Sequence, residues 1–363
     1  KRQLQIGFLA SSVAFLALFV PAEWLSSLMF GTVAYAFLFR LMAICSIFTI
    51  LYLEVAGFLQ GVQRIQEVAI INLAYYGIHS SVGVYLLLNG WRLYGVVVGW
   101  LVGSLVASVA GMILTVKYLG FLEKPYPVRT LVKFSLPLYV AGGVGFFVNW
   151  VDQLLLVSYM GLVHEAAEAQ RILGIYHVAI RASAVPGLFS SSIVTALFPQ
   201  LSELYAQQGS NSLRDAFRVS TRYSVLIGFP LIIGLTTLSR PIIILFAGGQ
   251  YIEAVEPLII LSIAALVGAV GLSVGPILMT LERTTIVSAL SIVSVVQSAS
   301  LSYFALAYLG LGMIGTAWVR AIGSIVSLAL NLYVLKRYIS VSFDKEALWK
   351  SSVASALMVL VIV

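Results

Sequence analysis

Long apolar runs separated by short polar stretches are the dominant pattern of this sequence. A helix needs about 20 residues to cross a bilayer core of roughly 30 Å, and eleven runs meet or approach that length. We expect helices at residues 4–20, 34–58, 68–89, 94–116, 134–158, 173–198, 220–239, 255–280, 285–308, 311–335 and 348–363. The pattern therefore predicts an all-α, polytopic membrane helix bundle of about eleven helices with no soluble domain.

Composition supports this prediction. Hydrophobic residues make up 61% of the 363 positions and charged residues 10%, which lies far outside the usual range for water-soluble proteins. Cys45 is the single cysteine, so no intrachain disulfide and no cysteine metal cluster can form. No cofactor is expected.

The distribution of cations predicts the orientation. With a cytoplasmic N-terminus, the predicted outer loops hold only Arg92, Arg171 and Arg240, whereas 15 of the 21 Lys and Arg residues lie in cytoplasmic segments. Cytoplasmic loops of membrane proteins carry this excess. The net charge of +7 is therefore explained by topology and anionic lipid headgroups in the plasma or inner membrane, and no nucleic-acid partner is expected.

An internal repeat divides the chain into two lobes. Arg64 corresponds to Arg283, Trp100 to Trp318, and Lys117-Tyr118 to Arg337-Tyr338, with offsets between 216 and 220 residues. Six helices separate each equivalent pair. The sequence therefore predicts two lobes of the same orientation, related by a pseudo-two-fold axis along the membrane normal.

The repeat also predicts the domain boundaries. We expect an N-lobe at 1–119, an inter-lobe linker at 120–130, a C-lobe at 131–338 and an additional, truncated C-terminal helix at 339–363. Counterparts of helices 134–158 and 173–198 would fall before residue 1, so two further helices are expected to precede this sequence. A short amphipathic segment, residues 210–222, is expected to lie on the cytoplasmic leaflet as an interfacial helix that tethers the two lobes.

Charged side chains within apolar helices are the first candidates for function, because each costs at least ~2.5–3.5 kcal/mol in the bilayer centre. Arg181 and Arg320 lie near the middle of their predicted helices and are expected to face a shared cavity. Arg40 is shallower, and either faces the same cavity or extends to the outer surface. Guanidinium groups suit phosphate because they present paired donors and remain charged.

Two polar helix faces accompany these arginines. His177 lies four residues before Arg181 on one face, and Asn149, Asp152 and Gln153 share a face of the preceding helix. The sequence leaves two roles open for this hairpin. It either binds an anionic substrate, or Asp152 neutralises Arg181 or Arg171 and locks the helix pair.

Acidic residues are candidates for ion coupling. Glu54 and Asp152 are the positions where Na⁺ or H⁺ could bind. For Glu54 the alternative is a solvated carboxylate near the cytoplasmic end of its helix.

Several short motifs carry a family resemblance. They are Phe134-Ser135-Leu136-Pro137, Asp152, Ala196-Leu197-Phe198-Pro199-Gln200-Leu201-Ser202, Gly228-Phe229-Pro230-Leu231 and Ile244-Leu245-Phe246-Ala247-Gly248-Gly249-Gln250-Tyr251. Their order and spacing resemble the polysaccharide-exporting branch of the multidrug/oligosaccharidyl-lipid/polysaccharide exporter superfamily, which has the MATE-like fold. The resemblance implies a flippase that moves a polyprenyl-(pyro)phosphate-linked oligosaccharide to the outer leaflet by alternating access. This chain would cover helices 3 to 13 of a 14-helix member.

Other functions compete with this interpretation. Within transporters, the alternatives are a cation-coupled multidrug antiporter of the same superfamily and a flippase for the peptidoglycan lipid precursor. A membrane enzyme acting on lipid-linked sugars is the alternative from a different class, but the sequence contains no phosphate-binding glycine loop, histidine metal motif or serine elbow. The expected partners are the lipid-linked oligosaccharide, membrane lipids and polysaccharide polymerases or glycosyltransferases, and the protein is expected to be a monomer.

Overall fold

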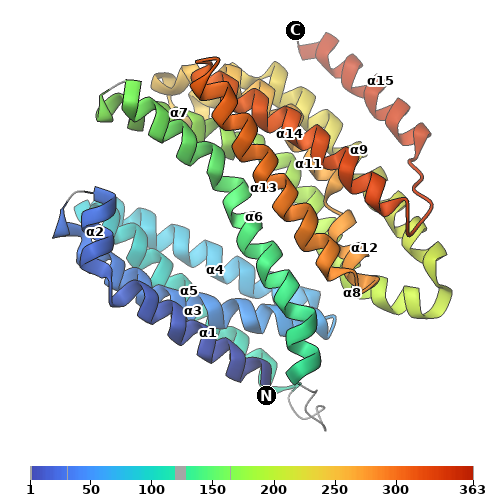
Figure 1. The fold of residues 1–363 in the computed structure, drawn as a ribbon, viewed down its shortest axis with the longest axis horizontal. Coiled ribbons are helices and arrows are strands. Elements are labelled where there is room, and N and C mark those ends of the chain that lie inside the picture. Colours follow the sequence, from blue (N-terminus) through green and yellow to red (C-terminus); the bar gives the residue numbers. More distant parts are fainter. Residues whose placement is uncertain (1, 31, 119–127, 164, 363) are drawn as a thin grey trace. The chain divides into compact units, whose positions relative to one another are not determined.

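The protein is a bundle of helices. The computed structural model describes residues 2–30, 32–118, 128–163 and 165–362 (Figure 1). Within these residues, seven helical stretches are long and apolar enough to cross a membrane, and a bent helix pair can form an eighth crossing. The predicted all-α, multi-pass membrane architecture is confirmed.

The chain divides into two compact units, Lys1–Pro127 (unit 1) and Val128–Val363 (unit 2). Of the predicted linker at 120–130, residues 120–127 lie outside the described part of the chain. Each unit has its own clusters of buried residues.

Unit 1 comprises α1 (Arg2–Phe19), α2 (Ala22–Phe30), η1 (Val33–Tyr35), α3 (Ala36–Gly61), α4 (Ile65–Leu86), η2 (Leu87–Trp91) and α5 (Arg92–Val116). The chain reverses direction between α4 and α5 at Gly90, whose φ of +86° suits glycine. The two helices then pack backbone to backbone, since a Cβ added at Gly99 would lie 2.6 Å from the Gly83 nitrogen. The apolar stretch Ile65–Val116 therefore contains both of the helices predicted there.

Unit 2 comprises α6 (Val128–Val163), α7 (Ala166–Ser183), α8 (Val185–Gln208), α9 (Ser210–Thr237), α10 (Ser239–Ala247), η4 (Gly249–Ala254), α11 (Val255–Gly271), α12 (Val274–Thr280), α13 (Thr284–Ala307), α14 (Gly312–Leu335) and α15 (Lys345–Ile362). The long helix α6 runs beside α13 (Figure 1). The Ser288 hydroxyl of α13 donates a hydrogen bond to the carbonyl of Pro137 within α6. This bond fixes the register of the two helices where proline interrupts the hydrogen bonding of α6.

The segment predicted as one helix at 173–198 is bent. Helices α7 and α8 meet at an angle of 47°, and Pro186 lies in the first turn of α8, where its missing N–H costs no helical bond. The bend separates the polar end of α7 from the apolar start of α8.

The prediction of an interfacial helix at residues 210–222 is wrong. These residues form the first half of the continuous helix α9. Leu213 and Phe217 are fully buried against Leu278 and Leu335 of the same unit, so the apolar face that suggested contact with lipid headgroups contacts protein instead. The segment lies wholly in unit 2.

Unit 2 repeats the helices of unit 1 in the same order. Helices α10, α11, α13 and α14 begin 217 to 220 residues after α2, α3, α4 and α5 respectively. The counterpart of the continuous helix α3 is broken into α11 and α12 near Leu272. The element boundaries thus follow the spacing that the sequence predicts for the repeat.

Candidate functional site

A buried ion pair forms the charged centre of unit 2. Asp152 of α6 and Arg320 of α14 lie 3.4 Å apart, measured from Oδ2 to Nη1. The aspartate side chain is 2% exposed and the arginine side chain 22% exposed. Because burying either charge alone costs several kcal/mol, the pair holds α6 and α14 together.

Two further donors complete the environment of Asp152. The Tyr176 hydroxyl of α7 donates to Oδ2 at 3.2 Å, and the backbone N–H of Gln153 donates to Oδ1 at 3.0 Å. The carboxylate is therefore satisfied by three helices of the same unit, which suits a fixed structural charge.

The ion-pair partner of Asp152 is Arg320, and not Arg181 or Arg171 as the sequence suggested. Arg171 instead pairs with Glu168 at 3.0 Å and with Glu253 at 2.5 Å, at the exposed end of α7. Tyr176 was missed as a site residue. Its position beside His177 within an apolar helix could have indicated a polar contact, because a buried tyrosine hydroxyl needs a hydrogen-bond partner.

His177 and Arg181 line a second feature of unit 2, an apolar cavity of ≈ 600 Å³. Its walls come from α7, α8, α9 and α10, and its other lining residues are Val178, Ala182, Val185, Leu235, Ile242, Ile243, Phe246 and Ala247. The His177 ring also contacts the Trp150 ring, with centroids 5.8 Å apart. The predicted shared face of His177 and Arg181 thus faces one cavity, which we call the apolar cavity.

Arg181 is exposed. Among the residues that the structure describes, none forms a hydrogen bond or ion pair with its guanidinium. An exposed cation beside hydrocarbon walls favours an amphiphile with an anionic headgroup and repels a cationic one.

Arg320 lines a different cavity of unit 2, with a volume of ≈ 330 Å³ and walls from α11, α13 and α14. We call it the polar cavity because serine and amide side chains dominate its polar lining. The structure thus brings Arg181 together with His177, and Arg320 with Asp152, and places the two arginines on separate cavities within this unit.

Arg40 belongs to unit 1. Its Nη2 lies 2.8 Å from the Glu23 carboxylate, and its guanidinium lies over the Phe19 ring at 5.9 Å. Both charged side chains are well exposed, so the pair forms a surface contact between α2 and α3.

Glu54 also belongs to unit 1, on α3. Its Oε2 is buried without a hydrogen-bond partner among the described residues. Its side chain packs against α1, where a Cβ added at Gly7 would lie 2.7 Å from Glu54 Cγ. The carboxylate is therefore held against a helix rather than fully solvated.

The remaining predicted site residues lie on α6. Gln153 is buried next to Asp152, whereas the side chain of Asn149 lies outside the described part of the structure. In the described residues no group of three His, Cys, Asp or Glu side chains could hold a metal ion.

Known structures share this fold. The chain aligns with an outward-facing multidrug resistance MATE family transporter of the MOP superfamily at a TM-score of 0.77, with 13% identity, over 92% of this chain and 77% of that one. It aligns with the lipid II flippase MurJ at a TM-score of 0.72, with 18% identity, over 98% of this chain and 76% of that one. At these identities the likeness concerns the fold alone.

Two relatives are similar in sequence. The probable low-salt glycan biosynthesis flippase Agl15 of Haloferax volcanii is 24% identical over 302 residues, which cover 83% of this chain and 61% of the relative. The teichuronic acid biosynthesis protein TuaB of Bacillus subtilis is 29% identical over 199 residues, which cover 53% of this chain and 39% of the relative. This chain therefore spans about three fifths and about two fifths of their lengths.

A family model decides the classification. Residues 5–256, well over half of the chain, match the model described as polysaccharide biosynthesis protein. The resemblance predicted from the short motifs is confirmed, and this multi-pass membrane protein belongs to the polysaccharide biosynthesis protein family.

Proposed function

We propose that the full-length protein is a flippase for a polyprenyl-(pyro)phosphate-linked oligosaccharide, working by alternating access of its two lobes. The observation that carries the proposal is the exposed Arg181 beside His177 in the apolar cavity. A cation at the wall of a hydrocarbon-lined space matches a phosphate attached to an isoprenoid chain. Family membership and the similarity to the Haloferax protein, a probable glycan biosynthesis flippase, support the same proposal.

The chemistry of the cavity bears on the alternatives. A cationic drug would meet Arg181 with like charge, whereas a lipid phosphate would gain charge-assisted hydrogen bonds. The proposal includes glycosyltransferases that build the glycan on the cytoplasmic leaflet and a polymerase or transferase that uses it on the outer leaflet. It treats the protein as a monomeric transporter rather than an enzyme.

The test is transbilayer movement in proteoliposomes containing the full-length protein. Polyprenyl-linked saccharides extracted from the source cells are incorporated, and sugars reaching the outer face are detected by impermeant periodate, which oxidises vicinal diols. We expect Arg181→Ala to lower the initial rate by about tenfold or more, because bonds to a charged group are worth roughly 1.5–3 kcal/mol.

Two variants control this experiment. Arg181→Lys retains the charge but not the planar donor pair and should fall between wild type and Arg181→Ala. Arg240→Ala removes an exposed arginine of α10 that is not among the cavity-lining residues, and should transport at the wild-type rate. Full transport by Arg181→Ala would remove the site, and gradient-driven efflux of cationic drugs without lipid movement would favour the antiporter.

A further inference from the structure

Neutral hydrogen-bonding groups supply most of the polar side chains that line the polar cavity, beside apolar residues. Four hydroxyls and two amides line it between α11, α13 and α14: Ser294, Ser298, Ser324, Ser327, Gln297 and Asn331. Its volume of ≈ 330 Å³ lies at the lower end of the range for small-molecule sites, roughly 300–1,000 Å³. Such a concentration of polar groups within membrane helices is expensive unless it is used.

Some of these groups are engaged within the protein. Ser294 and Ser327 share a hydrogen bond at 3.2 Å, and the Gln297 amide donates to the Gly323 carbonyl at 3.2 Å. In contrast, neither the Ser298 hydroxyl nor the Asn331 amide has a hydrogen-bond partner among the described residues. The cavity therefore offers donors and acceptors to a ligand.

The charge of the cavity limits which ligand fits. Arg320 is the charged lining residue, and Asp152 lies 3.4 Å from it, so the site carries little net charge. Apolar side chains such as Leu272 and Leu328 lie beside the glycine backbone of α11, which is exposed at Gly268 and half-buried at Gly271. Neutral donors and acceptors next to apolar side chains suit a pyranose ring, which has hydroxyls at its edge and C–H bonds on its face.

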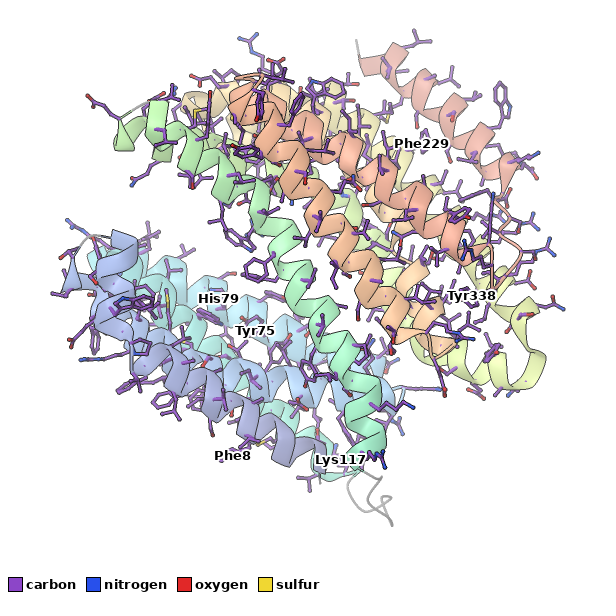
Figure 2. The ribbon with its side chains drawn as sticks, in the orientation of Figure 1. Phe8, Tyr75, His79, Lys117, Phe229 and Tyr338 are labelled. Carbon is purple, nitrogen blue, oxygen red and sulfur yellow. The ribbon has the colours of Figure 1, made fainter. Side chains whose placement is uncertain are left out.

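The equivalent helices of unit 1 pack closely at the position that corresponds to Gly323, so the cavity does not follow from the repeat alone. There, a Cβ added at Gly103 would lie 2.8 Å from His79 Cβ. Tyr75 lies on α4, as His79 does, and its ring stacks on the ring of Tyr52 of α3 with centroids 4.7 Å apart. Figure 2 shows Tyr75 and His79 on successive turns of α4. In unit 2, a Cβ at Gly323 would meet nothing closer than Gln297 Nε2 at 3.5 Å.

We propose that the polar cavity of unit 2 binds a sugar residue of the glycan, separately from the lipid phosphate. This inference rests on the proposed function for the identity of the ligand. Ser298 and Asn331 are the contacting residues, and Arg320 is a positioning residue held by Asp152.

The test is binding of free saccharide, which needs no lipid and no transport. The probe is the saccharide released by mild acid from the source cells' polyprenyl-linked pool. Saturation-transfer NMR with the full-length protein in detergent micelles reports contact with its ring protons. We expect transfer in wild type, and a loss of affinity of at least about fivefold in Ser298→Ala/Asn331→Leu, because two hydrogen bonds are removed.

Two variants make the result decisive. Gly268→Val fills space that is open in the structure, since a Cβ there meets nothing within 4 Å, and should block the saccharide without disturbing the fold. Ser300→Ala changes an exposed hydroxyl of α13 outside the cavity lining and should bind as wild type does. Absence of transfer in wild type, or equal transfer in the cavity variants, would overturn the inference.

Transport separates the two proposals. Arg181→Ala should lower the rate of lipid movement by about tenfold or more and retain saccharide binding, whereas the cavity variants should be impaired in both. A wild-type protein that binds saccharide but moves no lipid would end the proposed flippase function and leave the sugar site standing.

Discussion

The guanidinium of Arg283 lies over the ring of Tyr338, 5.5 Å from its centroid. The same pair occurs in unit 1, where Arg64 lies 5.1 Å from the centroid of Tyr118. In both units the arginine precedes a helix, and the residue before it has positive φ, +62° at Gln63 and +57° at Glu282. The repeat therefore conserves a local contact at the same point of both units, as well as the order of the helices.

These pairs should stabilise their units. We expect Arg283→Ala to lower the free energy of unfolding by about 0.5–1 kcal/mol, the usual range for an exposed cation–π contact. A double-mutant cycle with Tyr338→Leu, followed by unfolding in detergent, measures the coupling. Arg64→Ala should act in the same direction, and additive effects of Arg283→Ala and Tyr338→Leu would exclude the contact.

The buried pair of Asp152 and Arg320 should respond asymmetrically to mutation. Arg320→Ala leaves a carboxylate that is 2% exposed without its counter-charge and should cost about 3 kcal/mol or more. Asp152→Asn/Arg320→Met removes both charges and should be clearly more stable than Arg320→Ala. Denaturant unfolding in detergent compares the two, and equal losses would show that the charges are not coupled.

Close packing of α4 and α5 should not tolerate a methyl group at Gly99. A Cβ there would lie 2.6 Å from Gly83 backbone, so Gly99→Ala should destabilise unit 1 by about 1–3 kcal/mol. Gly77→Ala is the matched control on α4, because a Cβ there meets nothing within 4 Å. It should be neutral or stabilise the helix by roughly 0.5–1 kcal/mol, and similar thermal stability of both variants would contradict the packing.

Asp344 should make the start of α15 sensitive to acid. The backbone N–H of Ala347 donates to its carboxylate at 3.1 Å, and Arg218 and Arg222 lie 3.9 and 3.7 Å away. These contacts lower the pKa of Asp344 below its ordinary value of 3.8. A carboxylate with a depressed folded pKa stabilises the helix end above the unfolded pKa, and this contribution is lost as pH falls through the folded pKa.

Hydrogen exchange of the first-turn amides of α15 tests this prediction. After correction for intrinsic rates, protection in wild type should hold from about pH 6 to about pH 4 and fall below that. Asp344→Asn should show weaker protection throughout and a smaller acid-induced loss, with Glu346 and Lys350, which pair at 2.6 Å, accounting for the remainder. Identical pH profiles would exclude Asp344 as the cause.

The sequence alone determined the membrane class, most of the long helices and the spacing of the repeat. These properties depend on the length of the apolar segments and on their order along the chain, both of which can be taken from the sequence. It also indicated which charges lie inside apolar helices, including Asp152, Arg181 and Arg320. The 47° bend between α7 and α8 was not predicted, because a proline near a helix start is compatible with either a bend or a new helix.

Only the tertiary structure decided which charges meet. Asp152 and Arg320 lie 168 positions apart, and their contact depends on how α6, α7 and α14 pack around Tyr176. The tertiary structure also decided where the two cavities lie. The sequence of a single helix face does not show whether side chains of neighbouring helices fill the space beside it. In unit 1 the side chain of His79 lies against Gly103, where an added Cβ would be 2.8 Å from it, whereas in unit 2 the nearest atom to a Cβ at Gly323 is Gln297 Nε2 at 3.5 Å.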